Sequence, residues 1–589
     1  MRHRVFLSFL LVSIVCTVAG PLISQSLDGI TRLTVNQLGT EANDNSSQAV
    51  LGPNGKFVAL QSSASNLVPG DSNNAPDIFL RNLETGAFTR VSMSPSGADA
   101  NDGSFAPFIS ATTPNGFGAL VFASDASNLV RPASMVPDTN GVRDIFFALP
   151  GRGRLGRVTL GMGPSPADGA SNDPSVAVAA DPNRIFVAYS SAAANLVTGD
   201  SNGERDVFLT TIVNSEGEDE PLINGYTTIL VSKPAEGAVV TDGPSTKPQI
   251  SGDGRFIVFE SAATNLVSGF SSSERQIYLY EVASGEVTPI TRGFDGAPGN
   301  GSSRNPSISY SGSFIVFLSR ATNLIDDGIV PSGDALQIVR FNTRSKVFDR
   351  VNVSATGEAG NGQSGSLMDS QITPDGRLVV FTDTASNLVQ NDTNGVSDVF
   401  VKDMEGGSVT RVSVSASSVE GNGASVLPFL SRAAFSSRSA SILFASNASN
   451  LVAGDQAEQR DVFLSQYTAP RPTLKSNTRI EAPPDVVITD DDVKVTTPLY
   501  TFPTVVPRRL AAAKTRSKIR YQVEAFREGM TGRAADRRRV VSRRNQITIK
   551  NLKPGVYATR FRVLTLRNDT VVRRTPFSPA QRVSEEPQA

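Results

Sequence analysis

Short loops with the pattern Asp-x-Asn-Gly-x-x-Asp, or close to it, recur along the chain and offer oxygen atoms to a metal ion. Oxygen ligands at alternate positions, a Gly at the sharp turn and a later carboxylate are features of calcium-binding loops. The pattern lacks the middle acidic ligand and the distal Glu of an EF-hand. Asp and Asn also cap tight turns through hydrogen bonds to the backbone, so a structural role is the alternative. The predicted Ca²⁺ ligands are Asp71, Asn73 and Asp77; Asp138, Asn140 and Asp144; Asp200, Asn202 and Asp206; and Asp392, Asn394 and Asp398.

Repeats that depart from this pattern indicate that its two carboxylates act together. The fourth repeat ends at Gln276 and the fifth at Gln337, so where the first Asp is lost or displaced the last one is a neutral amide. The seventh repeat keeps Asp455 and Asp461 but has Ala457 at the Asn position. Loss of both charges together favours a shared role, such as holding one cation. No other cofactor is expected.

A run of arginines near the C-terminus is the second feature that could bind a ligand. It lies between two predicted strands, where such a run is usually a solvated hairpin. As a binding site it would dock on an anionic polymer, such as nucleic acid or envelope polysaccharide, or on an acidic face of the same molecule. No aromatic residues alternate with the arginines, so nucleic acid is not the expected partner. The arginines are Arg537, Arg538, Arg539, Arg543 and Arg544.

Charge divides the chain into two parts. Residues 507–589 hold 21 Lys and Arg against 6 Asp and Glu, a net charge of +15, whereas the residues before them hold 34 against 50, a net charge of −16. This asymmetry predicts two domains of opposite charge.

The N-terminus has the composition of a secretory signal. Arg2 to Arg4 form a basic patch, an apolar run follows from Val5 to Val18, and small residues end at Ala19. This arrangement predicts a signal peptide over residues 1–19, with a cut near Ser26 as the second option. We therefore expect an exported protein, in the periplasm, on the cell surface or outside the cell. No later stretch is long and apolar enough to span a membrane.

Cleavage of this signal would remove His3 and Cys16, the single His and the single Cys, and the chain has no Trp. The mature protein would then lack the residues for a Ser-His-Asp or Cys-His system, for a zinc site with N or S ligands, and for a disulfide. A glycosidase-type pair of carboxylates would still be available. Because the Asp residues recur as a structural motif would, we expect a protein without catalytic activity.

An Asn-Leu dipeptide positions these loops, since it occurs at a similar place in every repeat. Spacings of 58 to 70 residues between copies indicate one supersecondary unit stacked several times. The dipeptide persists where the Asp loops change, so we expect it to serve the turn or the core. The copies begin at Asn66, Asn128, Asn195, Asn265, Asn323, Asn387 and Asn450.

Each unit contains the pattern of four short strands. In the sixth unit, β-branched and aromatic runs at 378–381, 398–401 and 410–414 are separated by turns such as Pro374-Asp375-Gly376-Arg377. Four antiparallel strands per unit, repeated seven times, predict an all-β, seven-bladed propeller. The last unit lacks an outer strand, and the segment 30–35 has the sequence of an outer strand without inner ones before it. We therefore expect the N-terminal strand to close the ring.

These turns resemble those of the TolB-like, WD40-like repeat family of envelope propellers. The resemblance rests on Pro53-Asn54-Gly55-Lys56, Gly252-Asp253-Gly254-Arg255 and Pro374-Asp375-Gly376-Arg377, and it implies a propeller over residues 28–467. TolB itself has six blades and an additional N-terminal α/β domain, for which this chain has no room. The resemblance therefore implies the fold and not the role of TolB.

The C-terminal part is expected to be a separate, smaller β domain. Residues 468–484 contain Pro470, Pro472, Pro483 and Pro484, the composition of a linker. Over 485–586 the segments 519–526, 546–549 and 557–563 alternate like half-buried strands. The sequence around Tyr557 resembles the second half of a fibronectin type III domain, which implies a β-sandwich.

Taken together, these features predict an exported, non-catalytic propeller that presents an Asp/Asn-rich loop face to a protein or an envelope polysaccharide. Two alternatives remain. One is a calcium-stabilised adhesion or matrix protein, and the other is a carboxylate-dependent enzyme acting on carbohydrate.

Overall fold

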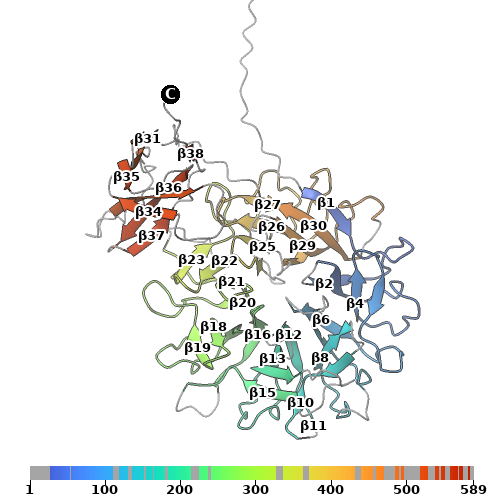
Figure 1. The fold of residues 1–589 in the computed structure, drawn as a ribbon. Helices are drawn as coiled ribbons and strands as arrows, with labels where there is room; N and C mark the ends of the chain where they lie inside the picture. The colour runs from blue at the N-terminus through green and yellow to red at the C-terminus, as the bar shows by residue number, and fades with distance from the viewer. Residues whose placement is uncertain are drawn as a thin grey trace, which may run out of the picture. The chain divides into compact units, whose positions relative to one another are not determined.

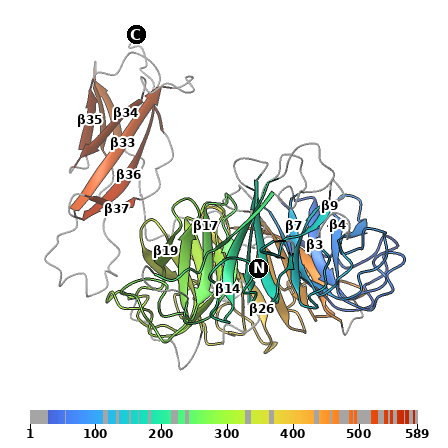
Figure 2. The ribbon, with the colours of Figure 1, turned by 90° about the horizontal axis from the view of Figure 1, so that it is seen from below.

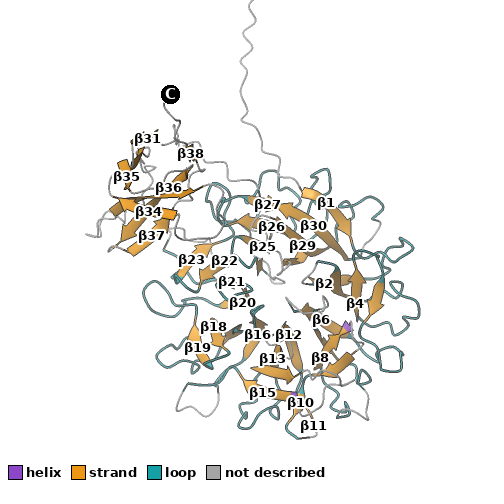
Figure 3. Ribbon diagram, in the orientation of Figure 1, coloured by secondary structure: helices purple, strands orange, loops and turns teal. Residues whose placement is uncertain are grey.

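A computed structural model of the chain divides into two compact units, Met1–Pro470 and Arg471–Ala589. Regular structure is almost entirely β-strand (Figure 3). In the second unit the structure describes the strands, and in the first unit it describes residues 27–469 apart from a few loop segments, so the predicted signal peptide lies outside the described residues. The undescribed loop segments are 53–54, 111–117, 131–135, 151–153, 164, 179–183, 214–224, 236–240, 327–335, 363–369, 431–438 and 456–458.

Seven four-stranded antiparallel sheets form the blades of a propeller in the first unit, which confirms the predicted fold (Figure 1). In blades 1 to 6 the strands pair in chain order, from the inner strand to the outer one. Blades 1 to 3 consist of β2 (Ser46–Leu51), β3 (Phe57–Ser62), β4 (Asp77–Asn82) and β5 (Phe88–Arg90); β6 (Ser104–Ile109), β7 (Leu120–Ser124), β8 (Asp144–Leu149) and β9 (Arg154–Arg157); and β12 (Ser171–Val178), β13 (Arg184–Ser191), β14 (Asp206–Val213) and β15 (Tyr226–Leu230). Blades 4 to 6 consist of β16 (Ser245–Ile250), β17 (Phe256–Ser261), β18 (Gln276–Glu281) and β19 (Glu286–Pro289); β20 (Ser303–Ile308), β21 (Phe314–Ser319), β22 (Gln337–Asn342) and β23 (Val347–Arg350); and β24 (Gln371–Ile372), β25 (Leu378–Asp383), β26 (Asp398–Asp403) and β27 (Val409–Arg411).

The seventh blade joins the two ends of the propeller. It consists of β28 (Ser425–Leu430), β29 (Ser439–Ser446) and β30 (Asp461–Thr468), and β1 (Leu27–Arg32) pairs antiparallel with β30 as its outer strand. Hydrogen bonds continue past the strand, since the amide of Leu33 donates to the carbonyl of Val462 at 2.7 Å. The predicted closure is confirmed, and it protects two sheet edges that would otherwise be unpaired.

The core of each blade is a row of large side chains on its two middle strands. In five blades an aromatic pair stacks across these strands, with ring centroids 5.6 to 6.0 Å apart. Such pairs contribute about 0.5–1.5 kcal/mol beyond their buried area. Figure 2 shows the propeller edge-on, with strands such as β14 and β17 crossing its thickness. The pairs are Phe122–Phe146, Tyr189–Phe208, Phe259–Tyr278, Phe381–Phe400 and Phe444–Phe463.

The Asp-Gly turns that carry the TolB-like resemblance join strands one and two of a blade. Gly376 has a φ of +74°, and a Cβ there would lie 2.3 Å from the ring of Phe314 in the preceding blade. Gly254 repeats the arrangement against Phe186, at 2.8 Å. Glycine is required at these turns both by the backbone conformation and by the close approach of the preceding blade.

Two sheets make up the second unit. One has the order β31 (Asp485–Thr489), β32 (Asp492–Thr496) and β35 (Gln546–Lys550). The other has the order β34 (Arg537–Ser542), β33 (Lys518–Arg527), β36 (Tyr557–Arg567) and β37 (Thr570–Arg574), and β38 (Gln581–Val583) pairs with β36. Strands were predicted at the positions of β33, β35 and β36. The fibronectin type III identity remains a prediction.

Among the residues that the structure describes, no helix has the length and apolar character needed to cross a membrane.

Candidate functional site

The Asn of each Asn-Leu dipeptide ties together two loops on one face of the propeller. Asn66 Nδ2 donates to the carbonyl of Glu41 at 2.7 Å, and its Oδ1 accepts from the amide of Asn43 at 3.1 Å. The neighbouring Leu67 is 4% exposed. The dipeptide therefore links the loop between strands two and three to the loop that enters the blade, which is the structural role expected of it. Equivalent contacts are made by Asn128, Asn195, Asn323, Asn387 and Asn450.

In the Asp-rich loops the central Asn also serves the turn. Asn140 Nδ2 donates to Asp144 Oδ2 at 3.0 Å, and its Oδ1 accepts from the amide of Val142 at 3.2 Å. The second Asp is further held by a hydroxyl, since Thr159 Oγ1 donates to Asp144 Oδ1 at 2.5 Å. These contacts correspond to the structural alternative, in which side chains cap a turn. The same Asn contacts occur at Asn73, Asn202 and Asn394.

An arginine that the sequence analysis did not connect to these loops lies between their two carboxylates. Arg157 at the end of β9 lies opposite Phe146 of β8, and its Nη1 is 3.1 Å from Asp138 and 3.4 Å from Asp144. In blade 1, Arg90 Nη1 is 2.8 Å from Asp71 and 3.3 Å from Asp77.

The arrangement recurs at the ring closure and in blade 6. Arg411 lies 3.1 Å from Asp392 and 3.3 Å from Asp398. In the seventh blade Arg32 of β1 lies 3.2 Å from Asp455 and 3.5 Å from Asp461. In these blades a guanidinium thus lies within ion-pair distance of both carboxylates of the loop.

Blade 3 keeps both carboxylates of the pattern but has no arginine at the corresponding position. Leu230 lies opposite Phe208, where blades 1, 2 and 6 have Arg90, Arg157 and Arg411. Burial, together with the nearby charge of Asp206, raises the pKa of Asp200 to about 6. Among the loops with both carboxylates in the described residues, this is the one in which a calcium ion would meet no competing guanidinium.

Burial dominates the electrostatics of the loops that do contain arginine. It raises the pKa of Asp71, Asp144 and Asp392 to about 6, even though the arginines lower it. Arg157 contacts two carboxylates, whereas Arg90 and Arg411 each contact a third one, of Asp99 and of Glu420.

The variation among blades contained a signal for this arginine. In blades 1, 2 and 6 it follows the second Asp by 13 residues. Blade 4 has lost the arginine together with the carboxylates, since Gln276 stands at the second Asp position and Pro289 lies opposite Tyr278. Gln276 instead accepts from Thr291 at 2.6 Å and donates to the carbonyl of Gly299 at 2.9 Å.

Apolar side chains project from the same face on the hairpins that lead from one blade to the next. Leu38 is 91% exposed and Phe294 is 63% exposed. Val419 and Met162 lie on equivalent hairpins and are about half exposed. The Asp and Asn side chains therefore build this face, while the apolar hairpin tips are available to a partner.

The central channel is lined by a repeated backbone distortion. The inner strands of six blades contain a β-bulge at the same position, marked by a non-Gly residue with φ between 45° and 53°. In five of them the next residue is Pro. A non-Gly residue in this region is strained, and strain of this kind is concentrated at functional sites. The residues are Gln48, Ala106, Asp173, Lys247, Asn305 and Leu427.

Hydrogen bonds between blades hold these bulges. The amide of Ala106 donates to Gln48 Oε1 at 2.9 Å, and the amide of Asn305 donates to Glu260 Oε2 at 2.7 Å. In each case a backbone donor of one inner strand is satisfied by a side chain of the neighbouring blade. The channel wall is therefore a connected structure in which each blade positions the next.

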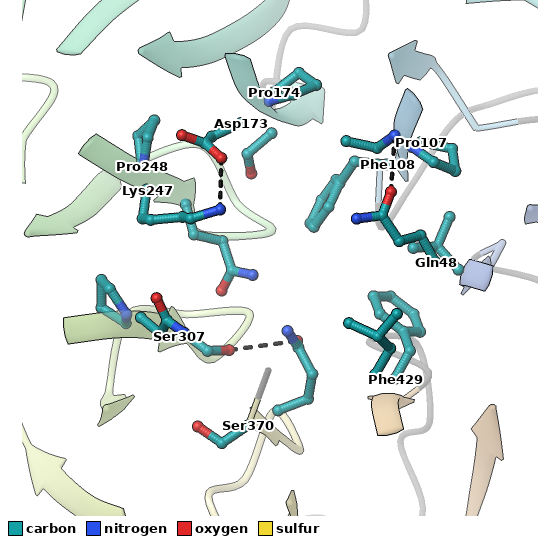
Figure 4. Close-up of a pocket in the computed structure, with 18 of the residues that line it drawn as sticks. Gln48, Pro107, Phe108, Asp173, Pro174, Lys247, Pro248, Ser307, Ser370 and Phe429 are labelled. Carbon is teal, nitrogen blue, oxygen red and sulfur yellow. Dashed lines mark hydrogen bonds and ion pairs between the residues drawn. The ribbon is translucent and has the colours of Figure 1, made fainter. Parts of the chain in front are cut away.

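A pocket of about 160 Å³ lies in this channel, and its two sides differ in character. Figure 4 shows Phe108 and Phe429 on one side, with ring centroids 6.4 Å apart. Across from them, Lys247 Nζ lies 2.7 Å from Asp173 Oδ1 (Figure 4). The Lys247 side chain is 53% exposed, so its charge is accessible. The pocket could hold an apolar group against the rings and a charged or polar group against the ion pair.

The structure divides the predicted arginine cluster of the second unit. Arg537, Arg538 and Arg539 begin β34, the edge strand of its sheet. Arg543 and Arg544 lie outside the described residues.

No family model and no curated protein matches this sequence. Solved structures do match in fold. A TolB candidate from Agrobacterium tumefaciens is 16% identical, with a TM-score of 0.28, 62% of this chain covered and 80% of that one. A prolyl endopeptidase is 11% identical, with a TM-score of 0.40 and coverage of 79% and 56%. The acylaminoacyl peptidase of Pyrococcus horikoshii is 12% identical, with a TM-score of 0.39 and coverage of 78% and 58%. This chain therefore spans less than two thirds of either peptidase.

These neighbours correct the expectation that the chain is not an enzyme. Two of the three are peptidases, so the fold gives no ground for excluding catalysis. Loss of His3 and Cys16 with the predicted signal would exclude only nucleophile systems built on those residues, whereas carboxylate chemistry needs neither. At this level of identity the likeness concerns the fold alone and assigns no reaction to this chain. What the strand pairing itself establishes is a seven-bladed β-propeller.

Proposed function

We propose that this chain is an exported binding protein whose propeller takes a segment of a partner protein at the central channel. The observation that carries the proposal is the two-sided pocket, with Phe108 and Phe429 facing Lys247 and Asp173. An extended peptide offers both kinds of group, an apolar side chain for the rings and a charged group for the ion pair. The hairpin tips at Leu38 and Phe294 would add contacts around the rim.

Preorganisation supports binding at this pocket. The bulged strands are held from blade to blade by hydrogen bonds, so little conformational freedom is lost when a ligand enters. Exposed aromatic and aliphatic anchors surrounded by polar residues are typical of the centres of protein interfaces. Export rests on the predicted signal peptide, and the destination is the periplasm, the cell surface or the outside of the cell.

The test is selection of a displayed library of random peptides on the mature chain, compared with an array of envelope polysaccharides. We expect peptides with a shared apolar-plus-charged motif to be enriched. Phe429→Ala and Lys247→Glu should each remove most of this binding, whereas Val347→Ala, on the outer strand β23, should retain it. Thermal melts check that the variants remain folded. Enrichment that the channel variants do not change would overturn the proposal, and binding of polysaccharide alone would assign the channel to the other partner class.

A second candidate is a calcium-stabilised protein, favoured by one observation in blade 3. There Asp200 and Asp206 lack the guanidinium that the other complete loops contain. Calcium at this loop would supply the missing positive charge, and the protein would then be stable in a calcium-rich environment such as a cell surface. Its test is the effect of calcium and chelator on the melting temperature, set out in the Discussion.

A further inference from the structure

The five-stranded sheet of the second unit separates its residues into two chemically different sets. Residues directly opposite each other in an antiparallel pair lie on the same face, and each face takes every second residue of a strand. In the pairing of β33 with β36, Arg520 lies opposite Leu564, Gln522 opposite Arg562, and Glu524 opposite Arg560. One set of alternate positions is therefore rich in arginine.

The neighbouring strands extend this set. On β34, Arg539 pairs with Glu524 and Arg537 pairs with Phe526, so both belong to the same face. On the other side of the sheet, Arg574 of β37 pairs with Leu564, and Arg582 of β38 pairs with Ala558. We call this set the arginine face; it contains Arg520, Arg537, Arg539, Arg560, Arg562, Arg574 and Arg582.

The opposite face is mainly apolar, and its arginines, Arg527, Arg538, Arg567 and Arg573, lie at the ends of β33 and β36 or on the strands that flank them. Tyr521 pairs with Val563, and Val523 pairs with both Phe561 and Val540. A sheet with one apolar and one charged face buries the apolar face, since seven arginines with one carboxylate among them cannot be buried without a large desolvation cost. The second sheet of this unit offers apolar residues such as Val493 and Ile549 in its own pairing. The apolar set is therefore the one suited to packing between two sheets, which leaves the arginine face for a partner.

The distribution of the arginines decides which anionic partner suits them. Neighbouring strands lie roughly 4.8 Å apart and same-face positions roughly 6.7 Å apart along a strand. The members of the arginine face occupy β33, β34, β36, β37 and β38, so they are distributed in two dimensions over the sheet. Figure 2 shows four of these strands, β33, β34, β36 and β37, in this sheet. A linear polyanion follows one row of charges, whereas a flat layer of phosphate headgroups meets all of them at once.

We propose that the arginine face binds the anionic phosphate headgroups of a lipid surface and so holds the protein at a membrane. The positive charge of residues 507–589 as a whole, +15, attracts the unit to such a surface, and the arginine face supplies the contacts. This proposal is independent of ligand binding by the propeller. It also divides the predicted cluster, because Arg537 and Arg539 belong to the arginine face whereas Arg538 pairs with Ala525 on the other.

The experiment is flotation of the full mature chain with vesicles of phosphatidylcholine alone and of phosphatidylcholine mixed with phosphatidylglycerol. We expect binding to the anionic vesicles only, and release by salt. The triple variant Arg520→Gln, Arg560→Gln and Arg562→Gln should weaken binding by about fivefold for each arginine, or roughly a hundredfold in all. The matched control removes the same charge at Arg508, Arg509 and Arg516, before the sheet begins, and should keep most of the binding.

Two further measurements keep the result interpretable. The triple Arg→Lys variant at 520, 560 and 562 keeps the positive charge of the face and should bind the anionic vesicles like the unmodified chain. Such binding would show that the Gln variant lost charge and not its fold. Equal loss in the face variant and in the matched control would overturn the proposal, because it would show attraction by net charge alone. Binding to heparin or DNA that is tighter than binding to the anionic vesicles would also overturn it and would assign the face to a linear polyanion.

Discussion

Arg157 Nη1 lies 3.1 Å from Asp138 Oδ1, and the two side chains are 0% and 4% exposed. The same guanidinium lies 3.4 Å from Asp144, and its Nη2 donates to the carbonyl of Val136 at 2.8 Å. A loop that the sequence suggests as a calcium site is thus completed by an arginine from the outer strand of its own blade. The outer strand of the blade therefore supplies the positive charge that offsets the buried carboxylates of the loop.

Replacing this arginine with the residue found in blade 3 should destabilise the propeller. Arg157→Leu leaves Asp138 and Asp144 buried without a cation, and breaking a buried pair in this way costs about 3–5 kcal/mol. Urea unfolding followed by circular dichroism measures the loss. Arg344→Leu, in the exposed turn between β22 and β23, is the matched control and should change stability by less than about 0.5 kcal/mol. Equal effects from the two variants would show that the buried cluster does not contribute.

The opposite exchange should stabilise blade 3 and decide the calcium question. Leu230→Arg places a guanidinium beside Asp200 and Asp206, so we expect a higher melting temperature without calcium. If the wild-type loop binds calcium, chelator lowers the wild-type melting temperature, and a ligand at 100 times its Kd stabilises by about 2.7 kcal/mol. The variant should then no longer respond to calcium. A wild-type melt that chelator leaves unchanged contradicts the calcium candidate in this loop.

The charge on Asp200 should lower the stability of the propeller in a way that depends on pH. Burial, with the charge of Asp206, raises its pKa to about 6 from the usual 3.8, so the folded protein favours the protonated carboxyl. Below pH 3.8 the carboxyl is protonated in both the folded and the unfolded chain, and its contribution to the free energy of unfolding is fully present. This contribution is lost as the pH rises through about 6, because the buried carboxyl then becomes charged. Asp200→Asn should therefore raise stability well above pH 6, by about 1 kcal/mol after allowance for solvent screening, and leave it unchanged below pH 3.8.

A carboxylate with the opposite shift provides the control for this pH series. Burial alone would raise the pKa of Asp242, but hydrogen bonds from Thr264 bring it below the usual 3.8. Asp242→Asn should therefore lower stability above pH 3.8, where the charged form accepts those bonds. Two substitutions of the same chemical type should thus act in opposite directions at neutral pH. The same sign for both variants would contradict the assigned environments.

Removal of the closing strand should open the propeller. A mature chain without residues 27–35 leaves β30 with an unpaired edge and removes Arg32 from Asp455 and Asp461. We expect a lower melting temperature and self-association, because an exposed edge pairs with other chains. Size-exclusion chromatography and thermal melts measure both effects. A synthetic peptide of residues 27–35 should restore the monomer, and a monomer of unchanged stability without it would contradict the closure.

Relief of backbone strain in the channel should stabilise the protein slightly. Ala106 has a φ of 51°, a conformation that glycine adopts at little cost. We expect Ala106→Gly to raise the free energy of unfolding by about 0.5–1 kcal/mol. The reason is that the backbone strain relieved in the folded protein is larger than the cost of the added conformational entropy of the unfolded chain. Ala123→Gly, in the regular strand β7, is the control and should lose a similar amount. A loss at Ala106 of the same size as at Ala123 would show that the bulge is not strained.

Local patterns in the sequence were sufficient for the architecture. The Asn-Leu dipeptide, the Asp-Gly turns and the alternation of apolar residues repeat in each unit, and each reports a preference within a few residues of chain. The missing outer strand at one end and the extra one at the other predicted the pairing of β1 with β30. The arginine at Arg90 and its equivalents was visible as part of a recurring strand, but its partners were not.

The sequence by itself therefore determined the repeat, the number of blades, the closure of the ring and the residues of the loop face. The tertiary structure decided what those residues contact. Arg157 reaches Asp138 only because β9 pairs with β8 in one register, and the inner strands line a channel only when seven blades surround one axis. Likewise, the arginines of the second unit form one face because the pairing of β33, β34 and β36 aligns alternate residues. Period-2 alternation is a local property, whereas register and ring closure depend on contacts between residues far apart in the chain, which no single stretch of sequence encodes.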